Sequence, residues 1–74
     1  MNTLDLIPVG SEAEVVAVHG VGTSLRRRLL DMGITPKTRV SLVRTAPLGD
    51  PLELKVRGYS LTMRKEDAKL VEVA

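Results

Sequence analysis

Apolar and polar residues alternate along several short stretches of this chain. Residues 52–57 (Leu-Glu-Leu-Lys-Val-Arg) alternate without a break, and residues 39–44 mix β-branched with charged side chains. Strict alternation is typical of a strand with one buried and one solvent-exposed face. Shorter apolar stretches at residues 12–18, 61–63 and 70–73 also favour strands. The pattern therefore predicts five short strands.

Residues 25–32 leave this alternation and predict one short α-helix. Thr23 or Ser24 can cap its first turn, and Gly33 stands where a left-handed C-terminal cap belongs. At about 100° per residue, one narrow face of the helix carries three apolar side chains that we expect to face the core. They are Leu25, Leu29 and Met32.

A second, single helical turn is expected at residues 65–68, just before the last strand. Five short strands, tight turns and one helix inserted after the first strand favour a mainly β domain. Closing the sheet removes exposed strand edges, so we expect a small closed or half-closed β-barrel. With 74 residues, the chain is long enough for one such domain, residues 1–74, and no second core.

Two prolines bracket the segment Ala46-Pro47-Leu48-Gly49-Asp50-Pro51, which joins two of the expected strands. Proline fixes φ and has no amide donor, so this segment should be a rigid loop rather than paired strand. Displayed loops often carry binding function. Leu48, Gly49 and Asp50 at its tip are therefore candidate partner-binding residues.

The arginines of the expected helix provide a second candidate surface. Arg26, Arg27 and Arg28 occupy its first turn, where the helix dipole disfavours cations. Leu30 falls off the core face and beside Arg26, so we expect both on an exposed flank. One interpretation is a docking patch of Arg26, Arg27 and Leu30, and the other is a solvated flank whose arginine stems cover the edge of the core.

Composition limits the function classes that need consideration. Eleven Lys and Arg against nine Asp and Glu give a net charge of +2, too little to indicate a nucleic-acid binder. Tyr59 is the only aromatic residue, and one aromatic side chain is too few to stack against the successive bases of a single-stranded nucleic acid. The longest aliphatic run, residues 15–18, is far too short to insert in a membrane. We expect a soluble, cytoplasmic domain.

Residues suited to catalysis or metal binding are few. The carboxylates are spread along the chain without an acid/base pair, and no cysteine is present, so we do not expect an enzyme or a thiolate metal site. His19 is the single histidine and has no second ligand at metal-site spacing, which makes it a weak metal candidate. Gly20 and Gly22 fit a tight turn better than a phosphate-binding loop or a helix-hairpin-helix.

Several segments together resemble the FeoA family of bacterial ferrous iron transport, in matching order and spacing over essentially the whole chain. These segments are residues 29–34 (Leu-Leu-Asp-Met-Gly-Ile), Pro36, residues 46–51, residues 57–61 (Arg-Gly-Tyr-Ser-Leu) and residues 64–68 (Arg-Lys-Glu-Asp-Ala). One departure is Lys37, where the family typically has glycine. We expect the lysine to change the turn type there.

The resemblance implies an SH3-like barrel that acts, without enzymatic activity, on the cytoplasmic GTP-binding part of the FeoB membrane transporter of ferrous iron. It supplies no residue-level docking site. An alternative is a metal-responsive module that binds Fe2+ weakly through carboxylates and His19, because a related barrel forms the C-terminal domain of iron-dependent repressors. A small nucleic-acid-binding barrel is a further alternative, and no cofactor is expected.

Overall fold

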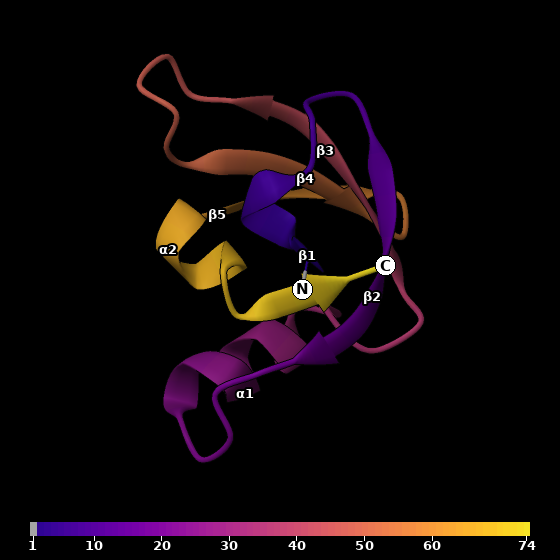
Figure 1. Cartoon of the computed structure of the whole chain (residues 1–74), viewed down its shortest axis with the longest axis vertical. Helices are drawn as coiled ribbons and strands as arrows, with labels where there is room; N and C mark the ends of the chain where they lie inside the picture. The colour runs from indigo at the N-terminus through magenta and orange to yellow at the C-terminus, as the bar shows by residue number, and fades with distance from the viewer. Residues whose placement is uncertain (1) are drawn as a thin grey trace.

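Six strands form one antiparallel sheet in the computed structural model, which describes residues 2–74. The sheet order is β1-β6-β2-β3-β4-β5, and the sheet curls into a barrel that is open between β1 and β5 (Figure 1). The strands are β1 (Asn2–Thr3), β2 (Glu12–Val18), β3 (Arg39–Thr45), β4 (Leu52–Val56), β5 (Tyr59–Met63) and β6 (Val71–Val73).

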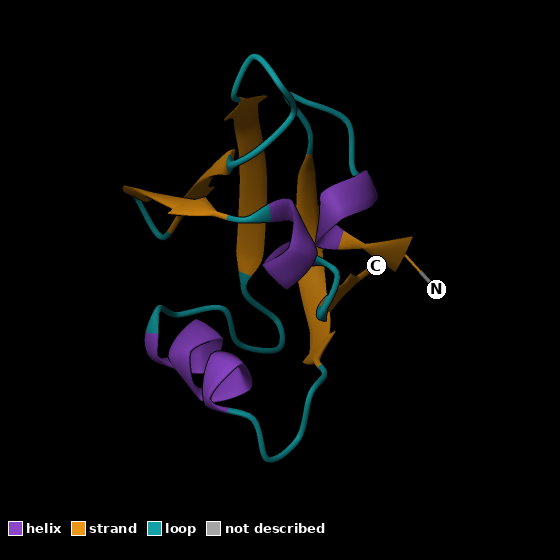
Figure 2. Cartoon of the chain, turned by 90° about the vertical axis from the view of Figure 1, so that its left-hand side faces the viewer, coloured by secondary structure: helices purple, strands orange, loops and turns teal. Residues whose placement is uncertain are grey.

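Three helical segments complete the fold. The 3-10 turn η1 (Leu4–Leu6) and helix α2 (Lys65–Ala68) contact each other at the open side of the barrel. Helix α1 (Ser24–Asp31) lies at one end of the molecule, as Figure 2 shows. Among residues 2–74, no helix has the length and apolar character needed to cross a bilayer.

The predicted fold class is confirmed, with one strand added. The five predicted strands correspond to β2–β6, and the helix and the helical turn lie where they were predicted, with ends shifted by one or two residues. β1 was missed because a two-residue strand cannot show alternation. It is defined instead by pairing with β6, in the register Asn2↔Val73.

Helix α1 begins and ends as its sequence predicts. The Thr23 hydroxyl accepts a hydrogen bond from the Arg26 amide at 3.2 Å and caps the first turn. Gly33 has φ +93°, and the Ile34 amide then donates to the Leu29 carbonyl at 3.1 Å. Because this folds Ile34 back onto the helix, its side chain becomes fully buried.

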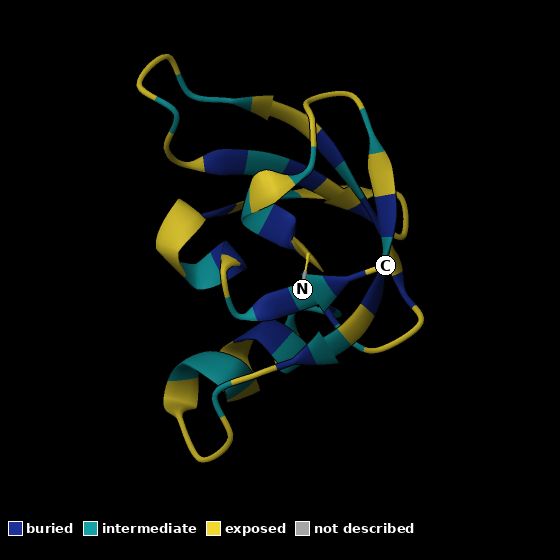
Figure 3. Cartoon of the chain, viewed as in Figure 1, coloured by how far each residue is buried: buried dark blue, intermediate teal, exposed yellow. Residues whose placement is uncertain are grey.

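The core is aliphatic and lies inside the curled sheet (Figure 3). Two register shifts, at Val16 in β2 and Val43 in β3, interrupt the alternation and leave these valines exposed. Such bulges bend strands, which suits a sheet that must curl. The largest fully buried side chains are Leu4, Val15, Leu29, Ile34, Val40, Leu42, Leu52, Leu54, Val56 and Val71.

The expectation for Lys37 is wrong. Lys37 has φ +74°, a left-handed conformation that glycine adopts without strain, so the turn keeps a glycine-like backbone. The Lys37 amide donates to the Val15 carbonyl at 2.7 Å, which holds the turn against β2. A non-glycine residue in this conformation costs about 1 kcal/mol or more.

Candidate functional site

The loop between β3 and β4 is held by hydrogen bonds at its base and by one to α2. Its ends are joined by a hydrogen bond from the Ala46 amide to the Pro51 carbonyl at 3.0 Å, and the Gly49 amide donates to the Ala46 carbonyl at 2.7 Å. Asp50 Oδ1 accepts a hydrogen bond from the backbone amide of Lys65, the first residue of α2, at 2.8 Å. The loop is therefore tied to α2, while the Leu48 side chain is 97% exposed.

Of the two predicted arginines on α1, only Arg27 is exposed. Arg26 is half-buried, and its Nε donates to the Val18 carbonyl at the end of β2 at 2.9 Å. The expectation that Arg26 lies on an exposed flank is thus wrong. This side chain joins α1 to the sheet, because the turn through Gly20 and Gly22 brings the helix back toward β2.

Leu30 is half-buried and packs against the core, which corrects the expectation of an exposed leucine. Leu25 and Met32 also pack partly against the core around the buried Leu29. The buried stripe of α1 is therefore wider than the three-residue face expected from the helical angle. Leu30 does lie beside Arg26 as predicted, in a hollow of ≈ 550 Å³ that Arg27 also lines.

The helix and the loop lie on the same side of the molecule but at opposite ends of its long axis, which measures 32 Å (Figures 1 and 2). A groove of ≈ 330 Å³ lies between them, and we call it the α1–α2 groove. It is lined by Arg28, Leu29, Met32, Pro51, Thr62, Met63, Arg64 and Asp67.

Sequence reasoning missed the α1–α2 groove. Arg28 in the arginine triplet was visible, but nothing in the sequence places Arg64 and Asp67 beside it. The structure brings Arg28 within 3.8 Å of the Asp67 carboxylate, so one ion pair bridges α1 and α2. The helix, groove and loop together form one continuous side of the molecule.

His19 lies at the end of β2, apart from these surfaces. Its Nε2 is 2.8 Å from Glu72 Oε1 on β6, so the imidazole has one carboxylate partner. Within residues 2–74, no group of three or more His, Asp or Glu side chains is placed to hold a metal ion. Weak metal binding through His19 stays a prediction. The helix-hairpin-helix alternative fails because a strand, β2, precedes the glycine turn.

Comparison with known proteins gives the family. Residues 2–74 match the FeoA domain family. The chain is 36% identical over 70 residues to the Fe(2+) transport protein A/Fe(2+) transporter FeoB fusion protein of Porphyromonas gingivalis; this covers 95% of the chain and only 8% of that protein.

Solved structures support the same assignment. An NMR structure of a FeoA-like protein from Clostridium acetobutylicum is similar, with a TM-score of 0.89 and 36% identity over 97% of this chain and 83% of that one. The crystal structure of Stenotrophomonas maltophilia FeoA complexed with zinc, described as a prokaryotic SH3 domain protein, has a TM-score of 0.89 and 28% identity. It covers 100% of this chain and 91% of that chain, which confirms the SH3-like fold.

A manganese-dependent transcriptional repressor shares the fold as well. Its TM-score is 0.88 at 14% identity, and the match covers 99% of this chain and 35% of the repressor chain. At that identity, the similarity concerns the fold alone. The family match and the FeoA structures together show that this chain belongs to the FeoA family.

Proposed function

We propose that this protein is a cytoplasmic accessory protein of ferrous iron uptake that docks on the cytoplasmic GTP-binding part of a FeoB-type transporter. The observation that carries the proposal is the Porphyromonas gingivalis relative, in which a FeoA-like segment and a FeoB transporter are fused in one protein. Fusion raises the effective concentration of two modules to about millimolar when the linker is short. Such a fusion supports a contact between the two modules, and the affinity of that contact depends on the surface of the FeoA-like domain.

The side that carries the loop, α2 and α1 suits such docking. Leu48 offers an apolar side chain that is almost fully exposed on a loop held at both ends. Transferring one leucine from water into an interface contributes about 1.5–3 kcal/mol. Because the loop is already ordered, little conformational entropy is lost when it binds.

Charged groups along the same side can fix the orientation of the partner. Arg27 is exposed on α1, and Arg64 is exposed at the rim of the α1–α2 groove. Arginines at an interface bind carboxylates in a defined geometry and increase the association rate. We therefore assign the docking surface to Leu48, Gly49 and Asp50 of the loop, the α1–α2 groove, and Arg27 with the accessible edge of Leu30.

A binding role rather than catalysis is supported by the pairing of the carboxylates. Each of three carboxylates lies beside an arginine instead of beside a second acid, so these groups do not form an acid/base pair of the kind glycosidases and proteases use. The pairs are Glu12–Arg39, Glu53–Arg44 and Asp67–Arg28.

The test is a titration of the labelled protein with the purified cytoplasmic domain of the FeoB-type transporter from the same organism, with and without a GTP analogue. We expect saturable binding that Leu48→Glu weakens and Val9→Glu does not. Val9 is a matched control, because it is also an exposed apolar residue (57%) on a loop. Absence of binding at every concentration, in both nucleotide states, would contradict direct docking.

A further inference from the structure

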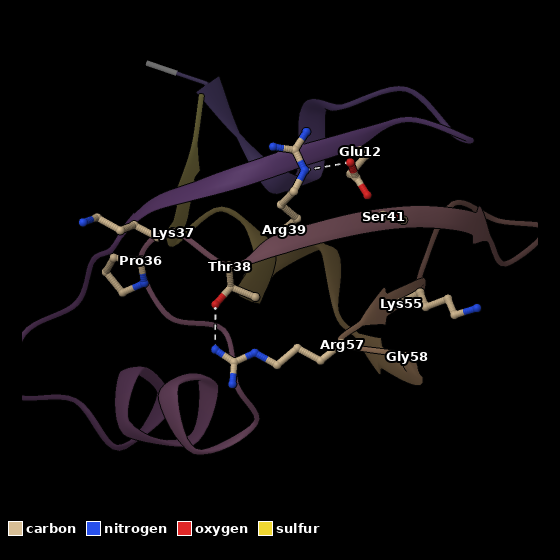
Figure 4. Close-up of a pocket in the computed structure, with 9 residues that line it drawn as sticks. All are labelled: Glu12, Pro36, Lys37, Thr38, Arg39, Ser41, Lys55, Arg57 and Gly58. Atoms are coloured by element: carbon tan, nitrogen blue, oxygen red, sulfur yellow. Dashed lines mark hydrogen bonds and ion pairs between the residues drawn. The ribbon is translucent and has the colours of Figure 1, made fainter.

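A basic hollow of ≈ 520 Å³ lies between the β4–β5 turn and the turn before β3 (Figure 4). In Figure 1, these two turns lie on the side opposite the loop, α2 and α1. No local sequence pattern indicates this hollow, because its residues come from three separate parts of the chain. It is lined by Glu12, Pro36, Lys37, Thr38, Arg39, Ser41, Lys55, Arg57 and Gly58.

Strand register explains why the sheet is hollowed here. Ser41 in β3 pairs with Glu12 in β2 on one side and with Lys55 in β4 on the other. A short side chain therefore stands between two long ones on the same face of the sheet. The serine forms the floor, and the long side chains form the walls.

The hollow has an excess of positive charge. Its four cations face a single lining carboxylate, which leaves three positive charges in excess, more than the +2 of the whole chain. Only Arg39 is neutralised: its Nε donates to Glu12 at 2.8 Å, and this hydrogen bond, with the nearby Glu12 and Glu14 charges, raises the pKa of Arg39.

The other three cations have no ion-pair partner among residues 2–74. Arg57 donates from Nη2 to the Thr38 hydroxyl at 3.2 Å, which orients the guanidinium toward the hollow without neutralising it. Lys37 and Lys55 form no ion pair within the described part of the chain. These cations are available to an anionic ligand.

Backbone strain supports a functional role for two of these cations. Lys37 has φ +74° and Arg57 has φ +50°, and they are the non-glycine residues of the described chain with positive φ. Glycine or asparagine would adopt both conformations with less strain. Residues in sparsely populated backbone conformations cluster at active sites, ligand clamps and switch regions. Both strained positions carry a cation that lines the same hollow.

We propose that the basic hollow binds a short acidic segment, rich in Asp and Glu, of a protein partner. Arginine forks and lysine ammonium groups match carboxylates, and the Ser41 and Thr38 hydroxyls add neutral hydrogen-bonding capacity. A single-stranded nucleic acid fits less well because no aromatic side chain lines the hollow. The one tyrosine, Tyr59, donates its hydroxyl to the Met32 carbonyl instead.

The test is fluorescence anisotropy with a labelled peptide of alternating Asp and Glu, compared with its Asn/Gln counterpart and an oligothymidine of similar length. We expect saturable binding of the acidic peptide alone. Lys55→Gln, Lys37→Gly and Arg57→Asn should each weaken it by about three- to fivefold, the upper part of the range expected for one exposed charge pair. Lys69→Gln, an exposed cation outside the hollow, is the matched control and should change binding by less than about twofold.

Stability separates a functional from a structural role for the strained cations. Lys37→Gly and Arg57→Asn relieve left-handed strain, so each should raise Tm, by about 2–5 °C, while weakening the peptide. Three results would overturn the proposal: no saturable peptide binding, equal weakening by Lys69→Gln, or tighter binding of oligothymidine than of the peptide. Leu48→Glu should leave peptide binding unchanged, so this test is independent of docking on the transporter.

Discussion

Leu30 on α1 and Leu48 at the tip of the β3–β4 loop both belong to the proposed docking surface, but they contact the rest of the molecule very differently. Leu30 packs partly against the core beside Leu29, whereas Leu48 is 97% exposed at the tip of its loop. Leu30 therefore contributes to folding through contacts within the chain. Leu48 makes almost no such contribution, so its side chain is free to contact a partner.

Helix α1 and the β3–β4 loop are also held in place by different contacts. α1 is held by its buried stripe and by the bond from Arg26 to β2, so its surface is a by-product of packing. The β3–β4 loop is held by its own backbone bonds and by Asp50, which leaves its tip free. A substitution at Leu30 or Arg26 should thus change both fold and surface, while one at Leu48 should change the surface alone.

The largest expected effect is on stability, from Leu30→Glu. Placing a carboxylate where a half-buried leucine packs should lower the free energy of unfolding by about 2 kcal/mol. The measurement is urea denaturation followed by circular dichroism. Leu30→Met keeps the volume and should cost less than about 1 kcal/mol. A Leu30→Glu protein as stable as wild type would show that this side chain contributes nothing to the core.

Leu48→Glu should have the opposite profile. We expect the free energy of unfolding to stay within about 0.5 kcal/mol of wild type, because the Leu48 side chain makes almost no contacts within the chain. Affinity for the transporter cytoplasmic domain should fall by about tenfold, through loss of an apolar anchor. Urea denaturation checks the unfolding free energy, and a binding titration checks the affinity. A destabilised variant would contradict the exposed position of Leu48.

Asp50→Ala tests the attachment of the loop to α2. Arg64, at the N-cap of α2, makes no side-chain capping bond, and Asp50 caps the Lys65 amide from the loop instead. Losing a cap of this kind costs about 1 kcal/mol. Hydrogen exchange at the Lys65 amide should speed up, whereas Asp50→Asn, which keeps the acceptor oxygen, should retain most of the protection. Unchanged exchange in Asp50→Ala would show that the loop is not held there.

The smallest effects are expected for the two arginines of α1. Arg26→Gln loses the bond to the Val18 carbonyl and should cost about 1 kcal/mol of stability. Arg27→Gln should leave stability unchanged and slow association with the transporter domain by about two- to threefold, an effect that fades at high salt. Urea denaturation measures the stability effect of Arg26→Gln, and stopped-flow binding at two salt concentrations measures the association rate of Arg27→Gln. Equal effects of both variants on stability would contradict the different roles.

The fold was predictable because its signals are local. Alternation at residues 52–57, the cap at Thr23 and the glycine at position 33 each determine an element from a few neighbouring residues. β1 escaped prediction because its evidence is a pairing with β6, a contact between the two ends of the chain. The pairing of β1 with β6 becomes visible only in the three-dimensional structure.

The candidate site was predictable in its loop and less so elsewhere. Prolines at positions 47 and 51 mark the loop without any long-range information. The helical angle places Leu30 correctly beside Arg26, but it cannot show how wide a stripe the barrel covers. The α1–α2 groove and the basic hollow are assembled from distant segments, so no local pattern indicates either of them.

Docking is tested most directly by an NMR titration of the isotope-labelled protein with the cytoplasmic domain of its FeoB-type transporter, with and without a GTP analogue. We predict that chemical shifts change at residues 47–50 and around Arg27 and Arg64, on the side that carries the loop, α2 and α1. Shifts confined to the basic hollow, or no shifts at any concentration in either nucleotide state, would contradict docking through this side.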